Sequence, residues 1–129
     1  NLDDIRHQYI DNLSGGQRQR AYIAMTLAQD TDYILLDEPL NNLDMKHSVQ
    51  IMQVLRKLAT ELNKTVVIVI HDINFASCYS DYIVAMKNGK LVQQGEVNHI
   101  MQSTVLQDIY DMTIPIQDID NHKIAVYFR

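Results

Sequence analysis

The chain has 129 residues, of which 47% are hydrophobic and 21% are charged. This length and composition predict one globular domain with a real core and no internal domain boundary. The net charge of −5 argues against a nucleic-acid-binding surface. A single cysteine, Cys78, cannot form an internal disulfide and is typical of a reducing compartment. The longest apolar run, at 66–70, is far too short for a membrane span.

The first predicted element is a helix that begins after a polar incoming segment at residues 1–12. Ser14 is a suitable N-cap, because its hydroxyl can accept from the free N–H groups of the first turn. The helix is expected to continue to Ala28. The apolar residues at helical spacing, expected on its buried face, are Ala21, Ala24, Met25 and Ala28.

A strand, a helix and a second strand are predicted next. The apolar run "YILLD" at 33–37 reads as the first strand, and the β-branched run "TVVIVI" at 65–70 as the second. Asp44 can cap the helix between them, which extends to about Asn63. One face of that helix is expected to carry Ile51, Val54, Leu55, Leu58 and Leu62. Strands that are apolar on both faces predict a parallel sheet buried on both faces, with a right-handed crossover.

The rest of the chain alternates short helices with hairpins. A short helix is predicted at about 73–80, and helical segments at about 97–100 and 104–110. Asn88-Gly89, between two apolar-rich stretches, is a strong signal for a hairpin over 82–95. The tail is expected to form a final hairpin that turns near Asp120-Asn121.

Two acids end the first strand, where open parallel sheets bind their ligands. Asp37 and Glu38 fit metal-assisted phosphate chemistry, in which one carboxylate supports magnesium and the other orients or deprotonates a water. The alternative is a strand that ends in a solvated acidic turn. His71 follows the second strand at the same edge and could bond a phosphate oxygen or a carboxylate's water; alone, it reads as an ordinary strand-end histidine. The remaining histidines, read as surface residues, are His7, His47, His99 and His122.

The segment "LSGGQRQR" at 13–20 opens the first helix. A helix N-terminus offers unpaired N–H groups and the positive end of the helix dipole, so it attracts anions. Ser14 adds a hydroxyl, and Gly15 and Gly16 let a phosphate approach the backbone. The alternative is a capped helix with a glycine-rich entry, which many proteins have.

Together these segments resemble the C-terminal half of an ABC-type ATPase, the nucleotide-binding subunit of a membrane transporter. "LSGGQRQR" is similar to the family's signature motif, "YILLDEP" to its Walker B strand, and "NNLD" at 41–44 to its D-loop. His71 matches the switch histidine, and the resemblance covers essentially the whole chain. The implied fold is α/β, a partial P-loop NTPase-type parallel sheet with flanking helices and C-terminal β-hairpins. The stretch at 71–95 resembles the importer branch that serves iron–siderophore, haem and cobalamin uptake.

The resemblance also implies roles for individual residues. Asp37 would support magnesium, and Glu38 would be the general base for attack of water on ATP. Asp44 would couple the two sites of a dimer, and His71 would sense the γ-phosphate and stabilise the transition state. Leu40 departs from the Thr or Ser frequent after the proline, with little expected chemical effect. The residues expected to contact the γ-phosphate of ATP held by the opposite subunit are Ser14, Gly15, Gly16 and Gln17.

The family's P-loop pattern, G-x-x-x-x-G-K-[ST], does not occur in the chain. Residues 1–129 are therefore interpreted as the C-terminal part of an ABC ATPase domain without its P-loop-containing N-terminal part. The parent would bind ATP and Mg²⁺ and hydrolyse ATP, whereas this chain alone is expected to bind ATP weakly and to be inactive. An incomplete sheet with an exposed edge or face also predicts self-association.

The expected partners of the parent are transmembrane permease subunits, a second ATPase subunit and, indirectly, a substrate-binding protein, at the cytoplasmic face of the cell membrane. Three alternatives stay open. A ribosome-associated ABC-type ATPase has a similar "DEPLNNLD" stretch, but its basic arm is missing here. A DNA-repair or chromosome-organising ATPase head would carry coiled-coil heptads, which the chain lacks. The third alternative is a non-catalytic dimerisation module.

Overall fold

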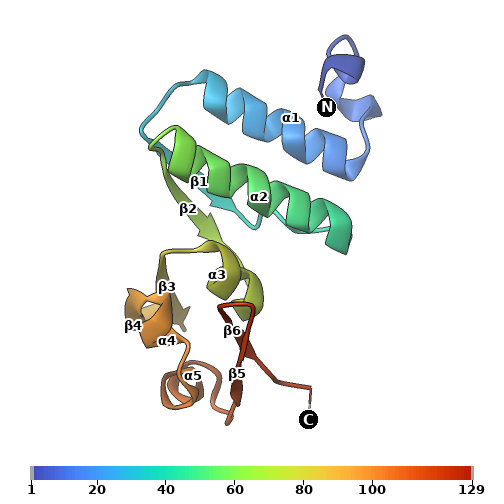
Figure 1. Ribbon diagram of the computed structural model, residues 1–129. Helices are drawn as coiled ribbons and strands as arrows, with labels where there is room; N and C mark the ends of the chain where they lie inside the picture. Colours follow the sequence, from blue (N-terminus) through green and yellow to red (C-terminus); the bar gives the residue numbers. More distant parts are fainter. Residues whose placement is uncertain (1, 129) are drawn as a thin grey trace. The chain divides into compact units, whose positions relative to one another are not determined.

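The computed structural model describes residues 2–128 (Figure 1). Asn1 and Arg129, the ends of the predicted incoming segment and of the C-terminal hairpin segment, lie outside the described residues. The chain divides into two compact units, Asn1–His71 and Asp72–Arg129, where the sequence predicted no internal boundary. The division falls just after the β-branched run at 65–70, without the glycine, proline or polar run that marks most linkers.

The first unit opens with the 3₁₀ turns Asp3–Ile5 and Ile10–Asn12, followed by helix α1 (Gly15–Ala28). The bounds of α1 agree with the sequence prediction, but its predicted buried face is wrong. Gly16 and Ile23 are the buried residues of α1, whereas Met25 is 54% exposed and Ala28 is exposed. Gly16 and Ile23 lie two helical turns apart and therefore share one face of the helix. This is the buried face, and Ile23 is its large apolar side chain.

Strands β1 (Tyr33–Asp37) and β2 (Thr65–Val69) form a parallel pair and are joined by helix α2 (Met45–Glu61). Ile34 pairs with Val66, so these side chains share one face of the sheet. Helix α2 contacts β2, and Figure 1 shows it lying along the two strands. This strand–helix–strand unit and the hairpins described below confirm the predicted α/β class.

The other face of the β1–β2 pair is open in the described part of the chain. Leu35 is 72% exposed, and its neighbours on β2, Val67 and Val69, are 51% and 49% exposed. The sequence predicted burial of both faces, because both strands are apolar throughout. Alternate side chains point to opposite faces, so one helix layer covers only every second residue.

Helix α2 buries five residues against the first unit's core: Ser48, Ile51, Met52, Leu55 and Leu58. Three of these agree with the sequence prediction. Val54 and Leu62 were also expected there but are 38% and 56% exposed. Met52 lies one residue after Ile51, so the buried stripe of α2 is displaced towards Met52 and away from Val54.

The second unit follows the predicted order of helices and hairpins. Its elements are α3 (Ile73–Tyr79), β3 (Tyr82–Lys87), β4 (Lys90–Glu96), α4 (Val97–Ile100), α5 (Ser103–Tyr110), β5 (Ile116–Ile119) and β6 (His122–Ala125). Both hairpins are antiparallel. Asn88 and Gly89 have φ values of 51° and 72°, as tight two-residue hairpin turns require. Asp120 and Asn121 also have positive φ, at 48° and 64°.

Side chains of helix α3 form hydrogen bonds with the backbone of the C-terminal hairpin. Asn74 Nδ2 donates to the Ala125 carbonyl (3.1 Å), and the Ala125 N–H donates to Asn74 Oδ1 (2.7 Å). The Ser77 hydroxyl donates to the Lys123 carbonyl (2.6 Å). These bonds satisfy backbone groups on the outer edge of β6. Ile100 and Leu106, both 0% exposed, are among the most buried residues of this unit.

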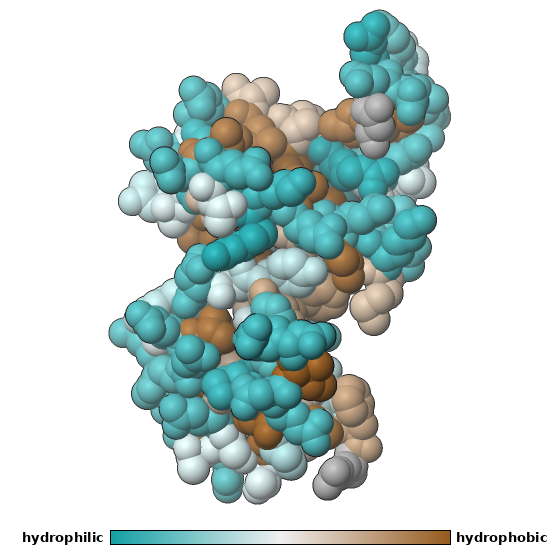
Figure 2. Space-filling view, in the orientation of Figure 1, coloured by the Kyte–Doolittle hydropathy of each residue, from teal (hydrophilic) through white to brown (hydrophobic). Residues whose placement is uncertain are grey.

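Apolar side chains also reach the surface of both units (Figure 2). In the described part of the chain, no helix has both the length and the apolar character that a membrane crossing needs.

Candidate functional site

The predicted acids and histidine lie at the carboxyl ends of β1 and β2. Because the strands are parallel, the residues that follow them emerge at the same edge of the sheet. Glu38 follows β1 directly, with a left-handed backbone (φ 46°), and its N–H donates to the Val69 carbonyl (3.1 Å). This bond extends the β1–β2 ladder by one residue and turns the chain away from the sheet.

Glu38 and His71 form a close pair at this edge. Oε1 of Glu38 lies 2.6 Å from Nε2 of His71. The second carboxylate oxygen, Oε2, accepts from Asn41 Nδ2 at 3.2 Å. The side chains of Glu38 and His71 are 39% and 79% exposed, so solvent reaches the pair. A carboxylate has about four acceptor positions, so these two contacts leave positions for a water.

Asp37 is placed differently from Glu38. It closes β1 opposite Val69, and its side chain is exposed. Among residues 2–128, no hydrogen bond or ion pair joins the Asp37 carboxylate to Glu38 or His71. The same residues contain no group of three or more His, Cys, Asp or Glu side chains that could hold a metal ion by themselves. Asp37 could therefore contribute one ligand, with the others supplied by water or by phosphate oxygens.

The N-terminus of α1 is a complete capping box. Ser14 Oγ accepts from the Gln17 N–H (3.3 Å), and Gln17 Oε1 accepts from the Ser14 N–H (3.0 Å). The first backbone bond of the helix runs from the Arg18 N–H to the Ser14 carbonyl (2.8 Å). The N–H groups of Gly15 and Gly16 lie ahead of that bond, so they are the first-turn donors that an anion could use.

The D-loop lies against these glycines. A methyl group added to Gly15 would lie 3.9 Å from the Asn42 carbonyl oxygen and 4.0 Å from Leu43 Cδ2, which is ordinary packing contact. A methyl group added to Gly16 would lie only 2.8 Å from Cδ2 of His47. The signature residues and the start of α2 are thus in direct contact within the first unit.

Asp44 is the N-cap of α2, as predicted. Its Oδ1 accepts from the backbone N–H of His47 (2.8 Å) and lies 2.8 Å from Nδ1 of the same histidine. The backbone hydrogen bond from His47, followed by the side-chain bond, lowers the pKa of Asp44 below its usual value. Asp44 is therefore ionised at neutral pH.

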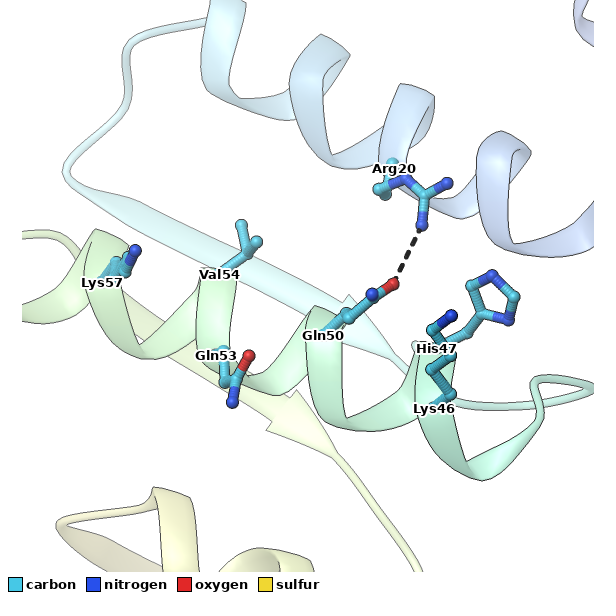
Figure 3. A pocket seen from close by; sticks show the side chains of 7 residues that line it. All are labelled: Arg20, Lys46, His47, Gln50, Gln53, Val54 and Lys57. Carbon is cyan, nitrogen blue, oxygen red and sulfur yellow. Dashed lines mark hydrogen bonds between the residues drawn. The ribbon is translucent and has the colours of Figure 1, made fainter. Parts of the chain in front are cut away.

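A hollow of about 470 Å³ lies between α1 and α2, beside the signature residues (Figure 3). Its lining residues are Arg20, Lys46, His47, Gln50, Gln53, Val54 and Lys57. Arg20 Nη1 reaches across from α1 to Gln50 Oε1 at 3.5 Å, the bond drawn in Figure 3. Neither Glu38 nor His71 lines this hollow.

Two side chains of this region were not predicted from the sequence to take part in it. Asn41 was treated only as part of a turn, yet it bonds Glu38. His47 was interpreted as a surface residue, yet its side chain is 35% exposed and lies between Asp44 and Gly16. The spacing of Asp44 and His47, an N-cap and the third helical residue, is a signal that could have indicated the contact.

The model of the family described as "ABC transporter" matches residues 1–41. The petrobactin import ATP-binding protein YclP of Bacillus subtilis (strain 168) is 68% identical over 127 residues, which are 98% of this chain and 50% of YclP. The chain is homologous to ABC-transporter ATP-binding proteins. It spans about half the length of the curated relatives it matches.

Two solved ABC structures show the same fold. An inward-facing metal-chelate type ABC transporter matches with a TM-score of 0.86 and 27% identity, over 99% of this chain and 53% of that chain. The dimeric structure of a bacterial ABC transporter cassette matches with a TM-score of 0.66 and 40% identity, over 74% of this chain and 40% of that chain. The ABC resemblance inferred from the motifs is thus confirmed by sequence and by fold.

Proposed function

We propose that this chain is the C-terminal part of the ATPase domain of an ABC importer subunit, and that the full-length protein hydrolyses ATP to drive uptake. The observation that carries the proposal is the pairing of Glu38 with His71, 2.6 Å apart, at the carboxyl ends of two parallel strands. The first unit, which holds this pair, also contains the signature residues, and these form a capped helix N-terminus.

In this proposal Glu38 is the general base. A water bonded to one of its free acceptor positions transfers a proton to the carboxylate as its oxygen attacks the γ-phosphorus of ATP; the bond from that phosphorus to the bridging oxygen breaks, and ADP leaves. His71 orients the carboxylate through Oε1, and Asn41 orients it through Oε2. His71 is also exposed enough to reach the γ-phosphate and stabilise its developing negative charge.

The proposed cofactor is Mg²⁺, with ATP as substrate. Asp37 fits this ion because it presents an exposed carboxylate at the strand end, and Mg²⁺ sites commonly combine one or two carboxylates with substrate phosphates and waters. When bound, the ion would neutralise charge on the β- and γ-phosphates. Asp37 would hold it directly or through water.

The signature residues would act on ATP held by a second subunit. The N–H groups of Gly15 and Gly16 are the free donors of the first turn, and Ser14 can still donate its hydroxyl proton while its oxygen accepts from Gln17. Gln17 would hold Ser14 in place through the reciprocal bond. Asp44 would couple the two sites of the dimer. A dimer is the form in which the matching cassette was solved.

We propose an iron–siderophore or related chelate as the transported substrate, because YclP is named as a petrobactin import protein. The importer would include transmembrane permease subunits and, indirectly, a substrate-binding protein. This subunit would be peripheral, at the cytoplasmic face of the membrane. The isolated chain would be inactive, since it lacks the P-loop pattern, and its open apolar sheet face would favour self-association.

The test is uptake and hydrolysis by the full-length protein. Deleting its gene should abolish uptake of radiolabelled ferric siderophore, and restoring the gene should recover it. The purified protein, reconstituted with its permease, should hydrolyse Mg-ATP. Normal iron uptake in the deletion strain would refute the transport assignment, and a reconstituted complex without ATPase activity would refute the enzymatic one. A matched control is the isolated 129-residue chain, for which calorimetric titration with Mg-ATP should detect no submillimolar binding and no turnover.

A further inference from the structure

The side chain of His47 bridges two segments that the function uses separately. His47 is the third residue of α2 and lies in the first turn of that helix. One edge of its ring faces the backbone of Gly16 in the signature helix, and its Nδ1 faces the D-loop carboxylate of Asp44. Figure 3 shows the ring projecting from the start of α2 on the side that faces α1.

The contact with Gly16 leaves no room for a side chain there while the His47 ring keeps its position. A methyl group on Gly16 would lie 2.8 Å from Cδ2, 3.1 Å from Cγ and 3.3 Å from Nε2 of His47. Separations below about 3.0 Å are far inside van der Waals contact, so either the ring or the helix would have to move. A side chain at Gly16 therefore requires the His47 ring to shift, independently of any phosphate.

The contact with Asp44 fixes the orientation of the ring. Asp44 Oδ1 accepts from the His47 backbone N–H and lies 2.8 Å from its Nδ1. An ionised carboxylate only accepts hydrogen bonds, so Nδ1 carries the proton and donates. In the neutral ring, Nε2 is then unprotonated. Two bonds to one carboxylate oxygen hold the imidazole so that its Cδ2 edge meets Gly16.

The same loop is joined to the catalytic pair at its other end. Asn41, the first residue of the D-loop, donates to Glu38 Oε2. Asn42 and Leu43 lie beside Gly15, and Asp44 bonds His47. A continuous series of contacts therefore runs from Glu38 through the D-loop to the first turn of α1.

We propose that His47 is a positioning residue that locks the D-loop carboxylate of Asp44 to the first turn of the signature helix, so that the two segments move as one body. This inference rests on the proposed ATPase function. In a dimer the first turn of α1 would serve the partner's ATP, while Glu38 serves the chain's own. The lock through His47 would make the placement of the signature turn depend on the D-loop.

Two substitutions separate the two contacts of the ring. His47→Phe keeps a flat ring against Gly16 but removes the donor to Asp44. His47→Asn keeps a donor near the position of Nδ1 but removes the ring from Gly16. The matched control is Lys46→Ala, which removes an exposed neighbour on the same turn. The assay is steady-state ATP hydrolysis by the reconstituted full-length complex.

Both His47 variants should lower kcat by about 3- to 10-fold, the range expected for losing one hydrogen bond or its packing equivalent. KM for ATP should change by less than about twofold, because the signature turn acts only after ATP is bound. His47→Ala, which removes both the ring and the donor, should lower kcat further than either of these variants. Lys46→Ala should match the wild type. Wild-type kcat in both His47→Phe and His47→Asn would overturn the inference and leave the ATPase assignment intact.

A second measurement does not depend on activity. Gly16→Ala should lower the melting temperature of the full-length protein, and adding His47→Ala should restore part of it, because the smaller side chain vacates the space that the new methyl group needs. Strictly additive losses would overturn the contact.

Long-range ¹H–¹⁵N spectra should show the His47 ring protonated at Nδ1, with the signal perturbed by Asp44→Asn. A ring protonated only at Nε2 would overturn the Asp44 link. A wild-type complex without ATPase activity would refute the proposed function, while these two readouts would still decide the role of His47.

Discussion

Replacing Glu38 by glutamine tests the proposed chemistry with the least change in shape. Glu38 now accepts at both oxygens, from Asn41 at Oε2 and from His71 at Oε1. In Glu38→Gln, the single amide oxygen can still accept from Asn41. The new amide group can then donate to Nε2 of His71, provided that the histidine moves its proton to Nδ1. Both neighbours therefore keep a hydrogen bond, and only the basicity is lost.

The magnitude of the effect follows from this geometry. A positioned general base contributes about 10²–10⁴-fold to a rate. With the fold of the site retained, kcat of the Glu38→Gln complex should fall by that factor, which is about 3–5 kcal/mol of transition-state stabilisation. Binding of ATP should be little changed, because Glu38 acts on the water rather than on the nucleotide.

The assay is single-turnover hydrolysis of Mg-ATP by the full-length complex, with ATP-dependent dimerisation measured in parallel. The matched control is Asn41→Ala, which removes one orienting bond but leaves the carboxylate and its pairing with His71. Its kcat should fall less than that of Glu38→Gln, by about 10-fold or less for one hydrogen bond. Unchanged turnover in Glu38→Gln, with Asn41→Ala more severely affected, would refute the assignment of Glu38 as base.

Three further predictions concern the folded state. Ile51→Ala in the full-length protein should lower the free energy of unfolding by about 2–5 kcal/mol in denaturant titrations, because Ile51 is 1% exposed, while Val54→Ala should cost much less. Burial raises the pKa of the Cys78 thiol, so alkylation by iodoacetamide at about pH 8 should be slower in the folded protein than in urea; equal rates would contradict this prediction. The pKa of Asp44 is lowered by its bonds from His47, so its stabilising contribution is complete above the unfolded value of 3.8 and is lost as the pH falls through the lowered folded value; Asp44→Asn should weaken that acid dependence of the melting temperature.

The sequence was sufficient wherever structure depends on neighbouring residues. Ser14 caps α1 and Asp44 caps α2, because each side chain reaches the N–H of the residue three positions on. Asn88-Gly89 forms its turn because these residues tolerate positive φ. The placement of Glu38 and His71 at one edge of the sheet was also predicted, since parallel strands bring their carboxyl ends together; their direct hydrogen bond was not.

The sequence was insufficient wherever the outcome depends on which surface an element meets. The apolar residues of α1 fit more than one helical stripe, and in the folded chain the buried residues of α1 are Gly16 and Ile23. Val54 fits the period of α2 as well as Met52 does, yet only Met52 faces the core. Both faces of β1 and β2 are apolar, so composition alone could not indicate that the face bearing Leu35 is open in the described chain. Which face of each helix or sheet is buried depends on tertiary packing, and local sequence patterns do not determine it.

The adjacent glycines of the signature segment illustrate how a functional motif can have structural causes within its own chain. Ser14 and Gln17 form hydrogen bonds with each other at the start of the helix. Their side chains therefore stabilise the helix terminus even when no ligand is bound. Gly16 is denied a side chain by the ring of His47, whereas a methyl group on Gly15 would make only ordinary contact with the D-loop. The two positions therefore differ: alanine at Gly15 should fit with little strain, whereas alanine at Gly16 requires the His47 ring to shift. A loss of ATPase activity in the Gly15 variant with unchanged stability would then report on the phosphate contact itself, which the Gly16 variant cannot isolate.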